Sequence, residues 1–193
     1  MAHPALAQLP DQALISNGNF QPVVLAIAHD ALRIALAQVG QLSERRMSHL
    51  WDAFFRQQAS GPPPRVPYGL QLRYPAAAVF TELKQLAAPA SLDTPPLDLG
   101  VEDHGTSAPL SVRKADAAIG LLENLLAIEL MLARDVLASA PAGLALGAGT
   151  GAALHMVEQA ISAADPRPDA VHRALREHFP ARPATGQNQA PPD

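Results

Sequence analysis

Cysteine is absent from the sequence, and its absence excludes several kinds of chemistry. Disulfide bonds, zinc–thiolate sites and thiol nucleophiles all require cysteine. Charged residues are also scarce, at 17% of the 193 residues, whereas an average globular domain contains about a quarter. We interpret this shortage as a sign of extensive buried surface, such as a large interface between subunits.

The sequence also lacks the features of nucleic-acid-binding, membrane and secreted proteins. The net charge of −4 offers no basic surface for phosphates or anionic lipids. The N-terminal stretch MAHPALAQLPDQ has no basic flank and no long apolar core, so it does not resemble a signal peptide. No run of about eighteen apolar residues is free of charge, so a membrane span is not expected. We therefore predict a cytoplasmic protein without nucleic-acid or membrane partners.

Apolar residues at helical spacing dominate the chain, and breaks rich in proline and glycine separate them. Three long helices are predicted over 22–57, 68–87 and 110–138, and two shorter ones over 152–163 and 168–178. The first helix would be roughly 50 Å long, which is typical of a bundle or an assembly. We predict an all-α, long-helix bundle with one domain over 1–179, a loop without a β-hairpin over 1–21, and a disordered tail over 180–193.

Other binding motifs are weak. The seven histidines are scattered without an HxxxH pair, so no metal site is predicted. The string GAGTG (147–151) has neither a preceding strand nor a following lysine, so it fits a helix-entry turn better than a phosphate loop. Glu44, Arg45 and Arg46 lie in the middle of the first helix, where some of them should face an interface and form pairs.

The segment from 91 to 108, SLDTPPLDLGVEDHGTSA, is the most chemically distinctive part of the chain. Glu102, Asp103 and His104 place two carboxyl groups and an imidazole in a row, which could serve general acid–base catalysis. The same residues could cap the next helix or remain solvated, since no nucleophile, ligand set or cofactor loop accompanies them. The residues alone indicate a helical interaction subunit and leave this segment's role open.

Seven short strings resemble, in order, the histidine and aromatic amino-acid ammonia-lyases. They are NGNF (17–20), GQLSERRM (40–47), YGLQ (68–71), PASLD (89–93), EDH (102–104), ENLLAIEL (123–130) and LGAGTGAA (146–153). Enzymes of this family use a methylidene-imidazolone (MIO) electrophile, which forms from an Ala-Ser-Gly tripeptide. The resemblance covers roughly residues 14–180 and implies the helical C-terminal part of that family's fold.

The resemblance also implies that other catalytic parts of the family lie on another chain. The family's tripeptide is far upstream of NGNF, whereas Ala59-Ser60-Gly61 here follows the first long helix and precedes three prolines. We interpret it as a chance match in a chain break. The family's catalytic tyrosine and carboxylate-binding arginine are also upstream, so they and the MIO group are expected on a larger partner chain.

By resemblance, four residues of this chain are candidates for the active site. Glu102, the acid of EDH, would be catalytic, and Phe20 of NGNF would line the substrate site. Leu70 or Gln71, just after the proline-rich break, would also face the substrate. A structural role stays open for both of the first two: Phe20 could be a core residue, and Glu102 could cap a helix or form an ion pair.

These implications lead to one hypothesis with alternatives. The chain would be the small C-terminal subunit of a split MIO-type ammonia-lyase, completing active sites with a larger MIO-bearing chain in a hetero-oligomer. The complex would eliminate ammonia from phenylalanine, tyrosine or histidine. The alternatives are an aminomutase subunit, a non-catalytic scaffold or regulatory partner, and a fragment of a longer protein. Alone, the chain is expected to self-associate because its helices are apolar on several faces.

Overall fold

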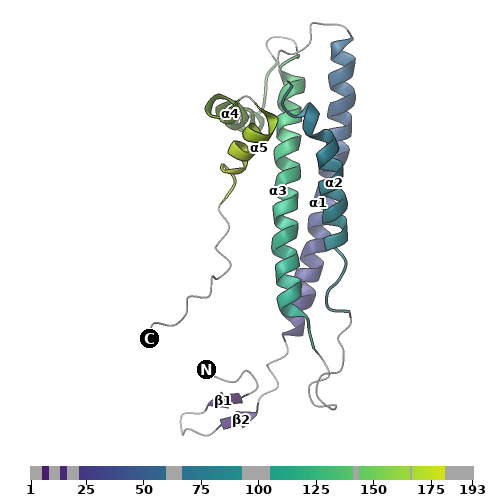
Figure 1. The fold of residues 1–193 in the computed structure, drawn as a ribbon, viewed down its shortest axis with the longest axis vertical. Coiled ribbons are helices and arrows are strands. Elements are labelled where there is room, and N and C mark those ends of the chain that lie inside the picture. The colour runs from purple at the N-terminus through teal and green to yellow at the C-terminus, as the bar shows by residue number, and fades with distance from the viewer. Residues whose placement is uncertain are drawn as a thin grey trace. The chain divides into compact units, whose positions relative to one another are not determined.

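A computed structural model describes residues 6–8, 14–16, 22–59, 67–92, 105–140, 144–165 and 167–180. Its elements are strands β1 (Leu6–Gln8) and β2 (Leu14–Ser16), the 3₁₀ turn η1 (Leu70–Leu72), and helices α1 (Val23–Gln58), α2 (Arg73–Leu86), α3 (Ala108–Leu137), α4 (Ala148–Ala163) and α5 (Pro168–Arg176). Figure 1 labels the two strands and the five α-helices. Helices account for most of these residues, which confirms the predicted all-α fold class.

The two short strands form an antiparallel pair that was not predicted from the sequence. Leu6 lies opposite Ser16, and Gln8 lies opposite Leu14. The prediction of a loop without a hairpin over 1–21 is therefore wrong in this respect. Strands of three residues are too short for their alternating pattern to stand out from the surrounding sequence.

Two of the three long helices begin and end near the expected positions, whereas α2 begins at Arg73 instead of residue 68, because the separate turn η1 precedes it. α1 and α3 lie within two residues of the expected 22–57 and 110–138 at both ends. Pro75 lies in the first turn of α2, where its missing N–H removes no helical hydrogen bond. α4 begins at Ala148, four residues before the expected start, because the glycines of GAGTG mask a helical turn in a sequence-based reading.

The contacts of the chain divide it into two compact units. Unit 1 comprises residues 1–42 and 77–122, and unit 2 comprises residues 43–76 and 123–193. α1 and α3 therefore contribute their first parts to unit 1 and their second parts to unit 2. The single domain expected over 1–179 stays a prediction, and residues 181–193 of the expected tail lie outside the described residues.

Unit 2 contains a hydrophobic core to which α3, α4 and α5 all contribute. Its buried members are Tyr68, Ala127, Met131, Val157, Ala160, Val171 and Leu175. On α5, Val171 and Leu175 lie one turn apart on the buried face, while Asp169 and Arg173 form an ion pair on the exposed face. The short helix α5 is thus held by its amphipathic pattern.

In unit 1, α1 buries small and polar residues and leaves most of its large apolar residues exposed. The buried positions are Ala26, Asp30, Arg33, Ala37 and Gly40. The exposed apolar residues are Val24, Leu25, Ile27, Leu32, Ile34, Val39 and Leu42. We call these seven residues the outer face of α1. Exposed apolar surface of this extent is typical of sites that contact another protein, a membrane or a ligand.

By length and composition, α1 is also the one helix among the described residues that could cross a membrane, over Val23–Gln57. The core helices of soluble proteins meet the same criterion. Its buried charged residues, Asp30 and Arg33, hydrogen-bond to other segments of unit 1, as they would in a protein interior. The absence of a membrane partner stays a prediction.

Candidate functional site

The structure describes two of the four candidate site residues. Phe20 and Glu102 lie outside the described residues. Leu70 and Gln71 lie in the turn η1 of unit 2, where Leu70 is half-buried and Gln71 is exposed. An apolar side chain beside an accessible amide could contact a ligand, but the roles of all four residues stay predictions.

Asp135 of α3 holds the turn that carries Leu70 and Gln71. Its fully buried carboxylate accepts hydrogen bonds from the backbone N–H groups of Tyr68 (3.0 Å), Gly69 (2.7 Å) and Leu70 (3.2 Å). Successive N–H groups at the start of a helical turn have no partners within the turn, and a carboxylate is a favourable acceptor for them. Asp135 therefore caps this turn from a different helix.

Gly69 brings the same turn directly against the backbone of α3. A Cβ atom at this position would lie 2.1 Å from the backbone nitrogen of Leu132 and 2.5 Å from the carbonyl carbon of Met131. The φ angle of Gly69 is −82°, so lack of space, rather than an unusual backbone conformation, requires glycine here. Close packing and hydrogen bonding together fix the turn.

The ionisation of Asp135 is governed by its burial. Loss of solvation raises the pKa of this carboxyl group above its usual value, and the three backbone donors offset only part of the effect. The guanidinium of Arg134 is 3.8 Å away and lies closer to Glu158, to which its Nε donates at 2.8 Å. Asp135 therefore depends mainly on neutral backbone donors.

The charged string at 44–46 forms ion pairs within unit 2. Glu44 pairs with Arg73 of α2, and Arg46 pairs with Glu129 of α3. Glu129 also accepts a hydrogen bond of 2.6 Å from the hydroxyl of Ser43. Pairing of this string was expected from its position in the helix, and the partners are other helices of the same chain.

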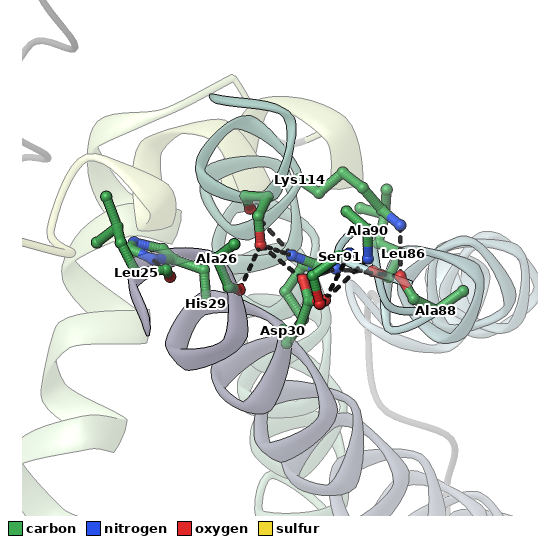
Figure 2. Close-up of polar contacts among 11 residues, drawn as sticks. Leu25, Ala26, His29, Asp30, Leu86, Ala88, Ala90, Ser91 and Lys114 are labelled. Carbon is green, nitrogen blue, oxygen red and sulfur yellow. Dashed lines mark hydrogen bonds and ion pairs between the residues drawn. The ribbon is translucent and has the colours of Figure 1, made fainter. Parts of the chain in front are cut away.

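Unit 1 contains a second buried carboxylate, Asp30 of α1, which binds the segment that follows α2 (Figure 2). Its Oδ2 accepts hydrogen bonds from the N–H of Ala90 (2.9 Å) and from the N–H (3.0 Å) and hydroxyl (2.7 Å) of Ser91. Its Oδ1 lies 2.6 Å from the hydroxyl of Ser111 and 2.6 Å from Nη2 of Arg33. One carboxylate thus joins α1 to the segments on either side of residues 92–107.

Arg33, one turn further along α1, is fully buried and binds the same two segments. Its Nε donates to the carbonyl of Leu86 (2.7 Å), and its Nη2 donates to the carbonyl of Ala88 (3.0 Å). Its Nη1 donates to the carbonyl (3.0 Å) and the hydroxyl (2.8 Å) of Ser111. A buried guanidinium requires acceptors and a counter-charge, and Asp30 supplies the charge.

The hydrogen bonds of this network determine the charge on Asp30. Burial alone would raise the pKa of Asp30, but hydrogen bonds from two serines and from Arg33 outweigh it and hold the pKa well below its usual range. At the edge of the network, burial and the positive charge of Arg33 lower the pKa of Lys114. Asp30 is therefore ionised at neutral pH and forms a buried ion pair with Arg33.

Asp30, Arg33 and Asp135 were not identified as candidates from the sequence. The available signal was a charge within a strongly apolar helical stretch, as in HDALRIAL (29–36) and LARDVL (132–137). Such a charge requires a buried partner. The partners lie dozens of residues away along the chain, so helical periodicity could not identify them.

The described residues include no cluster of metal ligands and only one residue of the Ala-Ser-Gly tripeptide. No group of three or more His, Cys, Asp or Glu among them could hold a metal ion. Of the tripeptide at 59–61, only Ala59 is described; it is exposed, and its N–H continues α1 by donating to the carbonyl of Phe55 (3.2 Å). Ser60 and Gly61 lie outside the described residues, so the interpretation of this tripeptide as a chance match stays a prediction.

Comparison with protein families establishes the relationship of the chain. The sequence model described as aromatic amino acid lyase matches residues 3–159. The chain belongs to this family. The matched range includes Asp30, Arg33 and Asp135, so both networks lie within the part of the chain that the family shares.

Two relatives show how much of a family member the chain represents. It is 38% identical over 151 residues to histidine ammonia-lyase from Streptomyces avermitilis, covering 72% of this chain and 29% of the relative. It is 36% identical over 159 residues to histidine ammonia-lyase from Alkaliphilus oremlandii, covering 79% of this chain and 30% of the relative. The chain therefore spans less than a third of the length of these relatives.

Two solved structures share the fold of the chain. Histidine ammonia-lyase from Trypanosoma cruzi superposes with a TM-score of 0.65 at 25% identity, covering 85% of this chain and 34% of that chain. Phenylalanine aminomutase from Pantoea agglomerans superposes with a TM-score of 0.67 at 18% identity, covering 87% and 34%. The helical architecture is thus that of one portion of the aromatic amino acid lyases.

Proposed function

We propose that the chain is the small subunit of a split ammonia-lyase that acts together with a larger chain bearing the MIO electrophile. The complex would eliminate ammonia from phenylalanine, tyrosine or histidine and release an arylacrylate. The observation that carries the proposal is membership of the lyase family combined with coverage of less than a third of its relatives. The remaining catalytic parts would then come from the larger chain.

The outer face of α1 supports the existence of a partner chain. Val24 is 82% exposed, Ile27 54% and Leu42 59%. Covering apolar surface is favourable by roughly 25 cal/mol per Å², so a partner that covers the whole face would gain substantial binding energy. In the proposed complex the larger chain covers this face, and self-association replaces it when the small chain is alone.

Each candidate site residue has a chemical role in the proposal. Glu102 would accept or relay a proton of the substrate, because a carboxyl group in an apolar pocket can have a pKa near neutrality. Phe20 would form an aromatic wall against the substrate ring. Leu70 and Gln71 would add an apolar contact and an amide from the turn that Asp135 fixes. The MIO group, when present on the partner, would supply the electrophile for loss of the amino group.

Co-expression with a neighbouring larger lyase-like chain tests the assembly. The proposal predicts that the two chains co-purify and that the complex converts one of the three amino acids into a product with strong ultraviolet absorbance. Each chain expressed alone is the control. Full activity of the larger chain by itself, unchanged by the small chain, would contradict the proposal.

Substitutions separate a catalytic contribution from that of a non-catalytic scaffold. In the complex, Glu102→Gln and Phe20→Ala should lower kcat/KM by about two orders of magnitude or more while the chains still assemble. Asp52→Asn, which neutralises an exposed carboxylate of α1, should leave the rate unchanged. Full activity of both site variants would support the scaffold alternative.

A further inference from the structure

The turn η1 of unit 2 is held at both ends by side chains that come from different helices. Before the turn, the carboxylate of Asp135 in α3 accepts the backbone N–H groups of residues 68–70. After the turn, Arg73 begins α2 and forms an ion pair with Glu44 of α1. The backbone of 68–73 is therefore tied to two helices that do not follow it in the chain.

The start of the turn is also anchored by packing. The side chain of Tyr68 is buried in the hydrophobic core of unit 2. The guanidinium of Arg134 lies 5.5 Å from the centroid of the Tyr68 ring, in the range of a cation–π contact. Gly69 lies so close to the backbone of α3 that it leaves no space for the turn to move toward that helix. Packing and the bonds to Asp135 thus restrict the same three residues.

The end of the turn is fixed by hydrogen bonds of Arg73. Its backbone N–H donates to the carbonyl of Leu70 and closes the turn. Its Nη2 donates to the hydroxyl of Ser48 (3.0 Å), one helical turn after Glu44 on α1. The side chains of Arg73 and Glu44 are only 17% and 20% exposed, so the pair is partly shielded from water. Charge-assisted hydrogen bonds of this kind are stronger than neutral ones.

Gln71 is the residue that this arrangement presents to solvent. Within 68–73, where every residue is described, only Gln71 is exposed. Its side-chain amide can both donate and accept hydrogen bonds. A polar group on a turn that is fixed before binding loses little conformational entropy when a ligand arrives. The contacts around the turn therefore prepare one accessible amide for recognition.

We propose that Asp135 and Arg73 are positioning residues for substrate recognition, which hold the two ends of turn η1 and thereby place the side chain of Gln71. This inference rests on the proposed function, in which Gln71 contacts the substrate. Asp135 and Arg73 act through the turn and have no role at the reacting atoms. A contact away from those atoms binds substrate and transition state alike, so loss of either residue should raise KM more than it lowers kcat.

Amide hydrogen exchange tests the hold on the turn without any need for activity. Asp135→Asn keeps the size of the side chain but replaces one acceptor oxygen with a donor. Exchange at 68–70 should become about tenfold faster or more, while exchange at 90 and 91, which Asp30 holds in unit 1, should stay unchanged. Asp52→Asn, the same substitution at an exposed position, is the matched control. Unchanged exchange at 68–70, or faster exchange throughout both units, would overturn the proposal.

Kinetics of the complex test the effect on recognition. Asp135→Asn should raise KM by about fivefold or more, the equivalent of one hydrogen bond, and change kcat by less than about twofold. Arg73→Met should act in the same direction with a smaller effect, and it keeps the proposal falsifiable if Asp135→Asn fails to fold. Asp52→Asn should leave both constants unchanged. Wild-type KM in both positioning variants would overturn the proposal.

A double-mutant cycle separates positioning of Gln71 from a merely structural role. Gln71→Ala should itself raise KM, and adding Asp135→Asn to it should raise KM by less than about twofold further. Fully additive effects would show that Asp135 does not act through Gln71. A wild-type complex without lyase activity would instead contradict the proposed function and, with it, the role in recognition. The exchange result at 68–70 decides in every case whether Asp135 holds the turn.

Discussion

Asp30 in unit 1 and Asp135 in unit 2 are both buried and both hold successive backbone N–H groups, yet their ionisation is affected in opposite directions. Hydrogen bonds from two serines and the charge of Arg33 hold the pKa of Asp30 well below its usual range. Asp135 has mainly backbone donors, and burial raises its pKa. At Asp135 the backbone donors offset only part of the desolvation, whereas at Asp30 the hydroxyl donors and Arg33 outweigh it.

Arg33→Leu should have the largest effect, because it removes the buried counter-charge that distinguishes Asp30 from Asp135. Asp30 would remain buried without its counter-charge, and the carbonyls of Leu86 and Ala88 would lose their donor. We expect a loss of about 4 kcal/mol in the free energy of unfolding, measured by urea denaturation. Arg45→Leu, at an exposed position of the same helix, should change it by less than about 0.5 kcal/mol. Equal effects of the two variants would contradict the account of Asp30.

Gly69→Ala should have the next largest effect, since it separates the turn from Asp135. The new methyl group would lie 2.1 Å from a backbone atom of Leu132, and a helix backbone cannot move aside cheaply. We expect the unfolding free energy to fall by about 3 kcal/mol, again by urea denaturation. Gly149→Ala is the control, because nothing lies within 4 Å of a Cβ at that position. A fully stable Gly69→Ala variant would show that the turn does not pack against α3 as described.

The pH dependence of stability should differ in sign between the two aspartates, and this is the smallest effect. The folded pKa of Asp30 is depressed, so its contribution is present above the unfolded pKa of about 4 and is lost as the pH falls. The folded pKa of Asp135 is raised, so the folded state gains stability from this group as the pH falls toward the unfolded pKa. As the pH falls from 7 to 3, the unfolding free energy of the wild-type chain should therefore approach that of the less stable Asp30→Asn variant.

Over the same range, the deficit of Asp135→Asn relative to the wild-type chain should grow. Urea denaturation of both variants and the wild type at several pH values measures the two trends. Parallel trends would show that the two carboxylates share one environment and would contradict the opposite pKa shifts.

The helices could be predicted from the sequence, but the two networks could not. Pro22 and the proline-rich break after α1 delimit a helix whose apolar residues recur at helical spacing. That spacing identifies a helix without telling whether Ile27 and Leu42 face the chain's own core or a partner, and they prove to be exposed. The partners of Asp30 and Asp135 depend on how distant segments come together, which no local pattern encodes.

The candidate site was predicted from resemblance, and the structure describes half of it. Leu70 and Gln71 lie in a turn that is fixed by Asp135 and Gly69. The sequence marks Asp135 only as a charge within an apolar stretch, and it does not reveal the contacts of either residue. Resemblance could therefore suggest residues for substrate contact, whereas the residues that hold their turn emerged only from the structure.

The central claim is that this chain completes active sites on a larger one, and adding purified chain to a fixed amount of the larger, MIO-bearing chain tests it most directly. The rate of arylacrylate formation should rise from a low baseline to a plateau at a fixed molar ratio of the two chains. The Glu102→Gln chain should bind to the same ratio without restoring the rate. A rate that does not depend on the added chain would contradict the account.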